Sequence, residues 1–122
     1  MSNCDKFNFT ESNGCTELNV GFDFDFGLTY KINDVAEDIT SYTFTGTIED
    51  DEGNVLFNLS EVVDDTSTGL FKDDPVNGHL RFIIIESDTN TFTNGSYKYI
   101  LRNVFNGKSD LFMTGYINAV EA

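Results

Sequence analysis

Residues 22–32 constrain the fold more than any other segment, because apolar and polar side chains alternate there without interruption. The apolar positions are Phe22, Phe24, Phe26, Leu28, Tyr30 and Ile32. A period of two residues places all six side chains on one face of a β-strand, whereas a helix would scatter them around its circumference. The segment therefore predicts an antiparallel strand with one buried face and one solvated face.

The same period continues in a second pair of segments, which predicts a hairpin. Tyr42, Phe44 and Ile48 are the apolar positions before the turn residues 51–54, and Val55, Phe57 and Leu59 are those after them. A four-residue loop, or a two-residue turn at Glu52-Gly53, would pair Ile48 with Phe57 and Gly46 with Leu59. Either loop keeps the apolar residues on one face, and a three-residue loop would not.

Residues 63–79 form the longest irregular stretch predicted, with a short edge strand at Leu70 and Phe71. Residues 80–86 follow as a strand that is apolar on both faces, so we expect it to be central in a sheet. No segment of the chain has the pattern of a helix.

The last hairpin is predicted from two alternating segments, 96–104 and 109–119, which meet at Asn106-Gly107. A two-residue Asn-Gly turn would place Tyr99 opposite Thr114. A three-residue loop with Gly107 in the left-handed conformation gives a different register, and we predict this second one. Its pairs are Tyr99 with Met113, Leu101 with Leu111, and Arg102 with Asp110, the last a favourable cross-strand ion pair.

In the predicted register, three apolar side chains, Ile100, Phe112 and Tyr116, fall on the outward face of the last hairpin. A contiguous apolar patch on a surface marks a contact site. The alternative is that an N-terminal arm folds over the patch with Phe7 and Phe9. These five residues are the candidate interface.

The tally of about seven short strands, with turns every 8–12 residues, predicts an all-β fold, an antiparallel two-sheet sandwich. We assign residues 17–122 to the sandwich and residues 1–16 to a short N-terminal arm or hairpin. Tyr97 begins the penultimate strand, where a tyrosine often hydrogen-bonds to upstream backbone in immunoglobulin-like sandwiches. We therefore predict an immunoglobulin-like sandwich with a structural tyrosine corner at Tyr97, the alternative being that Tyr97 is an ordinary strand residue.

The chain carries a formal net charge of -14, with 21 acidic and seven basic residues. Such an acidic surface repels phosphate backbones and anionic lipid headgroups, so neither nucleic acid nor a membrane is predicted as a partner. The charge serves solubility, or a partner with a basic patch, or bound divalent cations. The N-terminus has no signal-peptide pattern, so we expect synthesis in a cytoplasm, where the protein stays unless a larger assembly carries it out.

No catalytic, cofactor or metal site is predicted, and we expect a protein that is not an enzyme. Cys4 and Cys15 lie too far apart along a predicted hairpin for a disulfide and are expected to be free thiols. His79 is the only histidine, which is too few for a triad or a zinc site. Asp23 and Asp25 share a solvated strand face rather than a cleft, as a glycosidase pair would need.

Several segments together resemble small structural proteins of tailed bacteriophages, including cyanobacterial and marine phages. The matching stretches are Gly21 to Tyr30, Asp38 to Phe44, Thr68 to Phe71 with Asp74-Pro75, and Gly95 to Tyr99 with Gly115. The resemblance implies an immunoglobulin-like virion component of head, neck, tail or baseplate, made in the host cytoplasm, without catalytic residues. It also implies that the partners are other virion structural subunits and that the protein is multimeric in an assembly.

Two other functions remain open at this point. One is a host-recognition or carbohydrate-binding module displayed on the particle, which exposed aromatic side chains beside Asp and Asn loops would favour. The other is an unrelated cytoplasmic binding domain.

Overall fold

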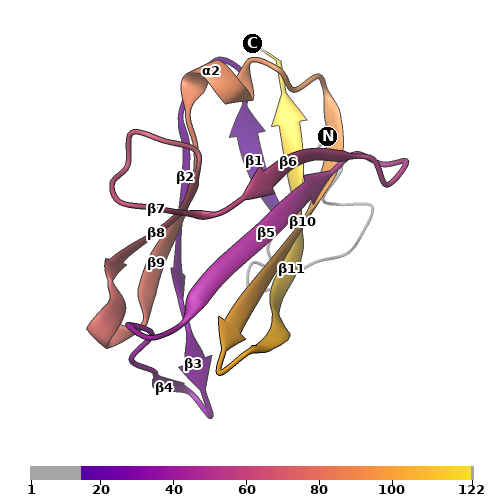
Figure 1. Ribbon diagram of the computed structural model, residues 1–122. Coiled ribbons are helices and arrows are strands. Elements are labelled where there is room, and N and C mark those ends of the chain that lie inside the picture. The colour runs from indigo at the N-terminus through magenta and orange to yellow at the C-terminus, as the bar shows by residue number, and fades with distance from the viewer. Residues whose placement is uncertain (1–14, 122) are drawn as a thin grey trace.

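The alternating segments pack face to face as two sheets in the computed structural model, which describes residues 15–121 (Figure 1). The strands are β1 (Cys15–Asn19), β2 (Phe24–Thr29), β3 (Lys31–Ile32), β4 (Val35–Ala36), β5 (Thr43–Glu49), β6 (Val55–Leu59), β7 (Glu61–Val62), β8 (Gly69–Asp74), β9 (His79–Ile84), β10 (Gly95–Phe105) and β11 (Lys108–Val120). A 3-10 helix, η2 (Pro75–Asn77), and a one-turn helix, α2 (Glu86–Thr89), interrupt them. Most of the predicted N-terminal arm, Cys4 included, lies outside the described residues.

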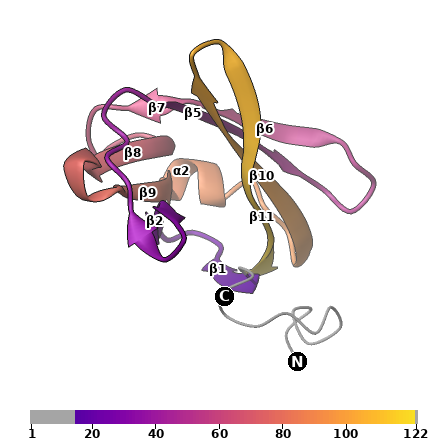
Figure 2. The ribbon, with the colours of Figure 1, turned by 90° about the horizontal axis from the view of Figure 1, so that it is seen from below.

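The strand order defines an immunoglobulin-like sandwich. One sheet has the order β1-β11-β10-β5-β6 and the other the order β2-β9-β8-β7, while β3 and β4 form a separate hairpin. In one layer β10 therefore lies between β5 and β11, and in the other β9 lies between β2 and β8. This is how the C, F and G strands of immunoglobulin domains separate from the B, D and E strands. Figure 2 shows β2, β8 and β9 on one side and the β10–β11 hairpin on the other.

Two strand pairs are parallel, which the sequence did not predict. β1 runs parallel to β11, and β7 runs parallel to β8, whereas the other pairs are antiparallel. The described residues also contain more strands than the predicted seven or so. Three of the additional strands, β3, β4 and β7, have only two residues each. The short helices η2 and α2 were not predicted either.

Only the central part of the alternating segment 22–32 forms the predicted strand, β2. Phe24 and Leu28 are buried in β2, as predicted, but Phe22 is 62% exposed and Ile32 is 45% exposed. Strand β2 ends at Thr29, and the Tyr30 N–H makes one more hydrogen bond beside β9, to the carbonyl oxygen of Gly78 at 2.8 Å. The polar turn of the β3–β4 hairpin then follows, with both of its central residues at positive φ.

The predicted pairs of the β5–β6 hairpin are confirmed, but its loop is not one of those predicted. Gly46 faces Leu59 and Ile48 faces Phe57. The Asp50 N–H donates to the Asn54 carbonyl oxygen at 2.9 Å, which closes a three-residue loop with Gly53 at φ 85°. A bulge in the ladder beside Ile48 then restores the register that keeps the apolar residues inside.

The predicted register of the β10–β11 hairpin is wrong. Phe105 pairs with Lys108, so the connection is the two-residue Asn106-Gly107 turn, with φ of 52° and 76°. A bulge after Leu101 then shifts the pairing, so that Leu101 faces Met113 and Tyr99 faces Gly115. Arg102 consequently lies opposite Leu111 rather than Asp110.

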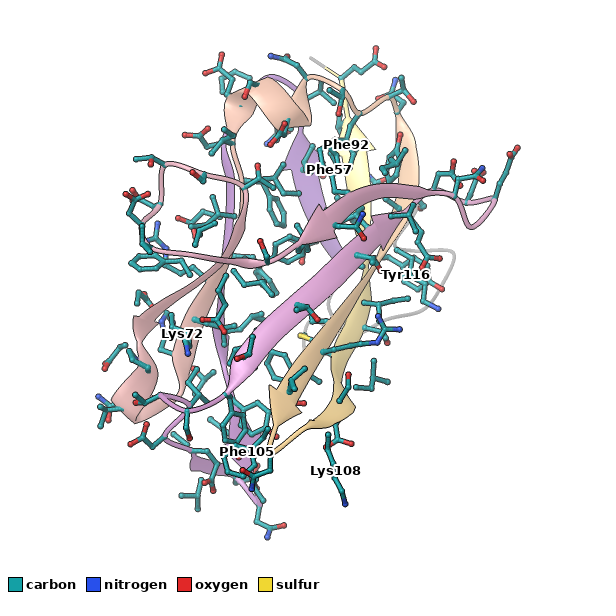
Figure 3. The ribbon with its side chains drawn as sticks, viewed as in Figure 1. Phe57, Lys72, Phe92, Phe105, Lys108 and Tyr116 are labelled. Atoms are coloured by element: carbon teal, nitrogen blue, oxygen red, sulfur yellow. The ribbon has the colours of Figure 1, made fainter. Side chains whose placement is uncertain are left out.

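The core between the sheets is built largely from aromatic rings. Phe82, in central strand β9, is fully buried and makes edge contacts with Phe24 and Tyr99 at centroid distances of 5.4 and 5.3 Å. Elsewhere in the core, Phe92 stacks on Phe57 at 5.6 Å, and Figure 3 shows these two rings turned toward one another. Aromatic pairs of this kind add stabilisation to the burial of their apolar area.

Tyr97 forms the hydrogen bond predicted for a tyrosine corner. Its hydroxyl donates to the carbonyl oxygen of Thr93 at 3.1 Å, and the Thr93 N–H donates back to the hydroxyl oxygen at 3.1 Å. The ring is 8% exposed and packs on the edge of Phe92 at 4.7 Å. The corner therefore ties the loop after α2 to the first residues of β10.

Replacing Tyr97 with phenylalanine is expected to lower the free energy of unfolding by about 0.5–1.5 kcal/mol, because the ring stays buried while its hydrogen bonds are lost. The midpoint of urea denaturation, followed by far-ultraviolet circular dichroism, measures this change. An unchanged midpoint would contradict a stabilising corner.

Tyr99 is expected to make stability fall at high pH. Burial raises the pKa of its phenol to about 12, whereas an unfolded tyrosine titrates near pH 10. The unfolded chain therefore loses this proton first, so Tyr99 contributes fully below about pH 10 and its contribution is lost between about pH 10 and 12. Urea midpoints measured across this range for the wild type and for Tyr99→Phe test the assignment, since the variant should lack this part of the decline.

Candidate interaction surface

The outward face of the five-stranded sheet carries two of the predicted interface residues. Ile100 alternates with the buried residues Tyr99 and Leu101, and Tyr116 precedes buried Ile117, so both side chains lie on the face turned away from the four-stranded sheet. Figure 3 shows Tyr116 on that side of the β10–β11 hairpin. Phe7 and Phe9 lie outside the described residues.

The prediction placed the third residue, Phe112, on the outward face, and this is wrong. Its ring lies 5.1 Å from that of Tyr30 and 5.5 Å from that of Phe44, and it packs against the core. The cause is the bulge after Leu101, which turns Phe112 inward and gives its outward place to Leu111. Leu111 is 64% exposed and belongs to the surface that the sequence interpretation missed.

Cross-strand pairing arranges the outward side chains in rows. Lys98 in β10 has Glu49 on one side and Tyr116 on the other. Ile100 lies between Thr47 and Thr114 in the next row, and Arg102 lies between Thr45 and Leu111 in the third. Directly opposite residues in a sheet have Cβ atoms about 4.5–5.5 Å apart, so each row is one continuous strip. We name this surface the outer face, defined by Glu49, Lys98, Ile100, Arg102, Leu111 and Tyr116.

The outer face has few acidic groups in a chain rich in them. The β10–β11 hairpin holds three of the seven basic residues and one of the 21 acidic residues. Two cations on the other sheet are used within the fold: Arg81 pairs with Asp25 and Asp65, and Lys72 pairs with Glu61 at 3.3 Å. Lys98 and Arg102 are in no ion pair among residues 15–121.

A shallow pocket lies at the end of the outer face beside the β5–β6 loop. Its volume is about 290 Å³, and its lining includes Tyr116, Lys98, Glu49 and Asp50. Asp50 accepts hydrogen bonds from the backbone N–H groups of Asn54 and Glu52, both at 2.9 Å. These bonds, that of Asn54 above all, hold the pKa of the Asp50 carboxyl below its usual value. The loop carboxylate is therefore ionised at neutral pH.

The acidic residues weighed as catalytic candidates each have a separate structural role. Asp23 accepts a hydrogen bond from the N–H of Glu86 at 2.7 Å, at the start of α2. Asp25 binds the guanidinium of Arg81, which raises the pKa of Arg81. The two carboxylates thus hold different elements and do not converge on one site.

The remaining candidate residues stand apart from one another. The His79 ring nitrogen Nδ1 lies 2.5 Å from Asp73. Within the part of the chain that the structure describes, no group of three or more His, Cys, Asp and Glu side chains is arranged to hold a metal ion. The backbone of Cys15, in β1, pairs with that of Tyr116, in β11. None of the described helices is long and apolar enough to cross a membrane.

Comparison with known proteins yields similarity at the level of fold. No protein-family model and no curated protein matches the chain. The crystal structure of a candidate glycoside hydrolase from Bacteroides vulgatus matches 88% of the chain with a TM-score of 0.50 and 8% identity. The chain spans 16% of that protein, so the similarity concerns the fold of one part alone. Dpr1 IG1, solved bound to DIP-eta IG1, matches 88% of the chain and 89% of its own length, with a TM-score of 0.42 and 18% identity.

Proposed function

We propose that this chain is a non-enzymatic structural protein of a bacteriophage virion, a component of the head, neck, tail or baseplate that acts through contacts with other protein subunits. The observation that carries the proposal is the outer face. It combines aliphatic side chains (Ile100, Leu111), an aromatic ring (Tyr116) and two cations (Lys98, Arg102) on a rigid sheet. Apolar and aromatic residues with Arg at the centre are typical of protein–protein interfaces.

The sequence resemblance to small structural proteins of tailed phages supports the choice of assembly. The resembling segments contribute the centre of the sandwich, since they include β2, the start of β5, and Tyr97 of the corner. These segments build a scaffold, and in this proposal the scaffold presents the outer face to neighbouring subunits.

Immunogold labelling of purified phage particles, with antiserum raised against the recombinant chain, tests the virion assignment. Gold confined to the head, the neck or the tail end is the expected result, and its position also identifies the part of the particle. Absence of label from both intact and disrupted particles would overturn the assignment. Antiserum absorbed with the recombinant chain is the control for specific labelling.

A second candidate function, carbohydrate binding by a module displayed on the particle, is favoured by the pocket at the end of the outer face. The pocket places the Tyr116 ring beside the carboxylates of Glu49, Asp50 and Asp51, and sugars bind to an apolar ring face with polar groups around it. A glycan array with the wild type and with Tyr116→Ala tests this function. Specific binding that is lost in the variant would establish it, and an array without specific binding would exclude it for the glycans tested.

A further inference from the structure

We propose that the outer face is the contact surface of a homodimer in which two copies of this chain pack sheet against sheet. The inference deepens the proposed function, since it names the first partner of the chain as a second copy. It does not depend on the virion assignment, because self-association is measured on the purified chain.

Charge decides where two copies can meet. At a net charge of -14, most approaches bring like charges together, and like-charge juxtaposition across an interface costs several kcal/mol. The three rows of the outer face over β5, β10 and β11 contain one carboxylate, Glu49, and two cations, Lys98 and Arg102. A dimer formed through this face leaves the acidic loops in solvent and buries a surface without excess negative charge.

The rows also specify how the two copies are oriented. Closed dimers have a two-fold axis, and a residue that faces another is faced by it in return. An axis parallel to the strands and between β5 and β10 exchanges these two strands and keeps each row in place. Glu49 of one copy then faces Lys98 of the other, twice in the dimer, and Thr47 faces Ile100 twice. An axis perpendicular to the strands would instead stack Lys98 on Arg102, which is repulsive.

The size of the face places the proposed contact among weak, transient interfaces. The outer face together with its neighbouring strand β6 covers four strands. At about 4.8 Å between strands and about 3.4 Å rise over seven residues, these strands give a patch of roughly 20 by 24 Å. A standard stable interface buries about 800 Å² on each partner, and this patch is smaller. We therefore expect a reversible dimer with a dissociation constant in the micromolar range.

The test is a charge exchange between the two facing residues, measured by sedimentation equilibrium on the full chain. Lys98→Glu alone and Glu49→Lys alone should each weaken dimerisation at least about tenfold, because each places two pairs of like charges in the interface. An equimolar mixture of the two variants should recover dimers, since both facing pairs then join a carboxylate of the Lys98→Glu copy to an ammonium group of the Glu49→Lys copy. The wild type should be a dimer at high micromolar concentration and a monomer after dilution.

Two comparisons separate the proposed contact from a general effect of charge. Lys31→Glu makes the same charge change on the exposed β3–β4 hairpin and should dimerise like the wild type. Glu49→Lys reduces the net negative charge, so non-specific repulsion predicts stronger association where the proposed contact predicts weaker association. Unchanged near-ultraviolet circular dichroism of both interface variants verifies that they are folded.

A wild type that is monomeric at all concentrations would overturn the proposal, as would a variant mixture that does not associate. These failures are distinct from failure of the proposed function. Labelled particles together with a monomeric chain leave the virion role standing and remove the dimer. Unlabelled particles, together with a dimer that responds to the charge exchange as expected, would remove the virion role and leave the dimer standing.

Discussion

Replacing Phe82 with alanine is expected to lower the free energy of unfolding by about 3–5 kcal/mol. The Phe82 ring is fully buried between the two sheets and touches the rings of Phe24 in β2 and Tyr99 in β10. Without the ring, the stabilisation from its buried apolar area is lost. A cavity also remains between the two sheets, which cannot move together far enough to fill it. Because domains of this size are stable by about 5–15 kcal/mol in total, the expected loss is between about a fifth and all of the wild-type stability.

Phe22→Ala is the matched control, because it makes the same chemical change at a ring that is 62% exposed. We expect this variant to stay within about 0.5 kcal/mol of the wild type. The chain contains no tryptophan, so urea denaturation followed by far-ultraviolet circular dichroism is the suitable measurement. Equal losses in the two variants would contradict the assignment of Phe82 to the centre of the core.

Local patterning explains why most strands could be predicted from the sequence. A period of two residues is a property of neighbouring side chains, and it located the core of β2 and the strands β5, β6, β10 and β11, while a short continuous apolar run located β9. The parallel pairing of β1 with β11 has no such local signal, because it joins residues about 100 positions apart. The two-residue strands β3, β4 and β7 are too short to show a period.

The register error at β10–β11 shows which local signal should have had more weight. The predicted register was chosen for the apolar pairs Tyr99–Met113 and Leu101–Leu111 and for an ion pair between Arg102 and Asp110. An exposed ion pair contributes only about 0–1 kcal/mol. Asn-Gly strongly favours the two-residue turn that the structure has. Burial of the Phe112 ring, worth roughly 1.5–3 kcal/mol, then outweighs the ion pair, and the bulge after Leu101 makes that burial possible.

The candidate interface was predictable only where it depends on alternation within one strand. Ile100 and Tyr116 were placed on the outer face because their neighbours are apolar core residues. Leu111 was missed because its direction depends on the bulge, and the Glu49–Lys98 row was missed because it depends on the pairing of β5 with β10. Pairing between strands that are distant in the sequence is a tertiary property, so the composition of the outer face emerged only from the fold.

Replacing Gly69 with alanine is the second change with a large expected effect, about 4 kcal/mol of lost stability. Gly69 begins β8 at φ +155°, a conformation that costs other residues about 1–3 kcal/mol. An added Cβ would also lie 2.5 Å from the carbonyl oxygen of Ser60, which accepts the hydrogen bond of the Leu70 N–H at 2.9 Å. The backbone must therefore shift where the chain passes from β6 to the other sheet, at a further cost of about 1–3 kcal/mol.

Gly95→Ala isolates the steric part of this cost. Gly95 begins β10 at φ +147°, close to the value at Gly69, but an added Cβ there meets no atom within 4 Å. We expect Gly95→Ala to lose only the conformational strain, and Gly69→Ala to lose about 1–3 kcal/mol more in the same urea titration. Equal losses would mean that the crossing between the sheets can move aside, and the close contact of β8 with Ser60 would then contribute little to stability. A larger loss at Gly69 would show that this crossing is rigid, and it would also explain why a glycine is needed where β8 begins.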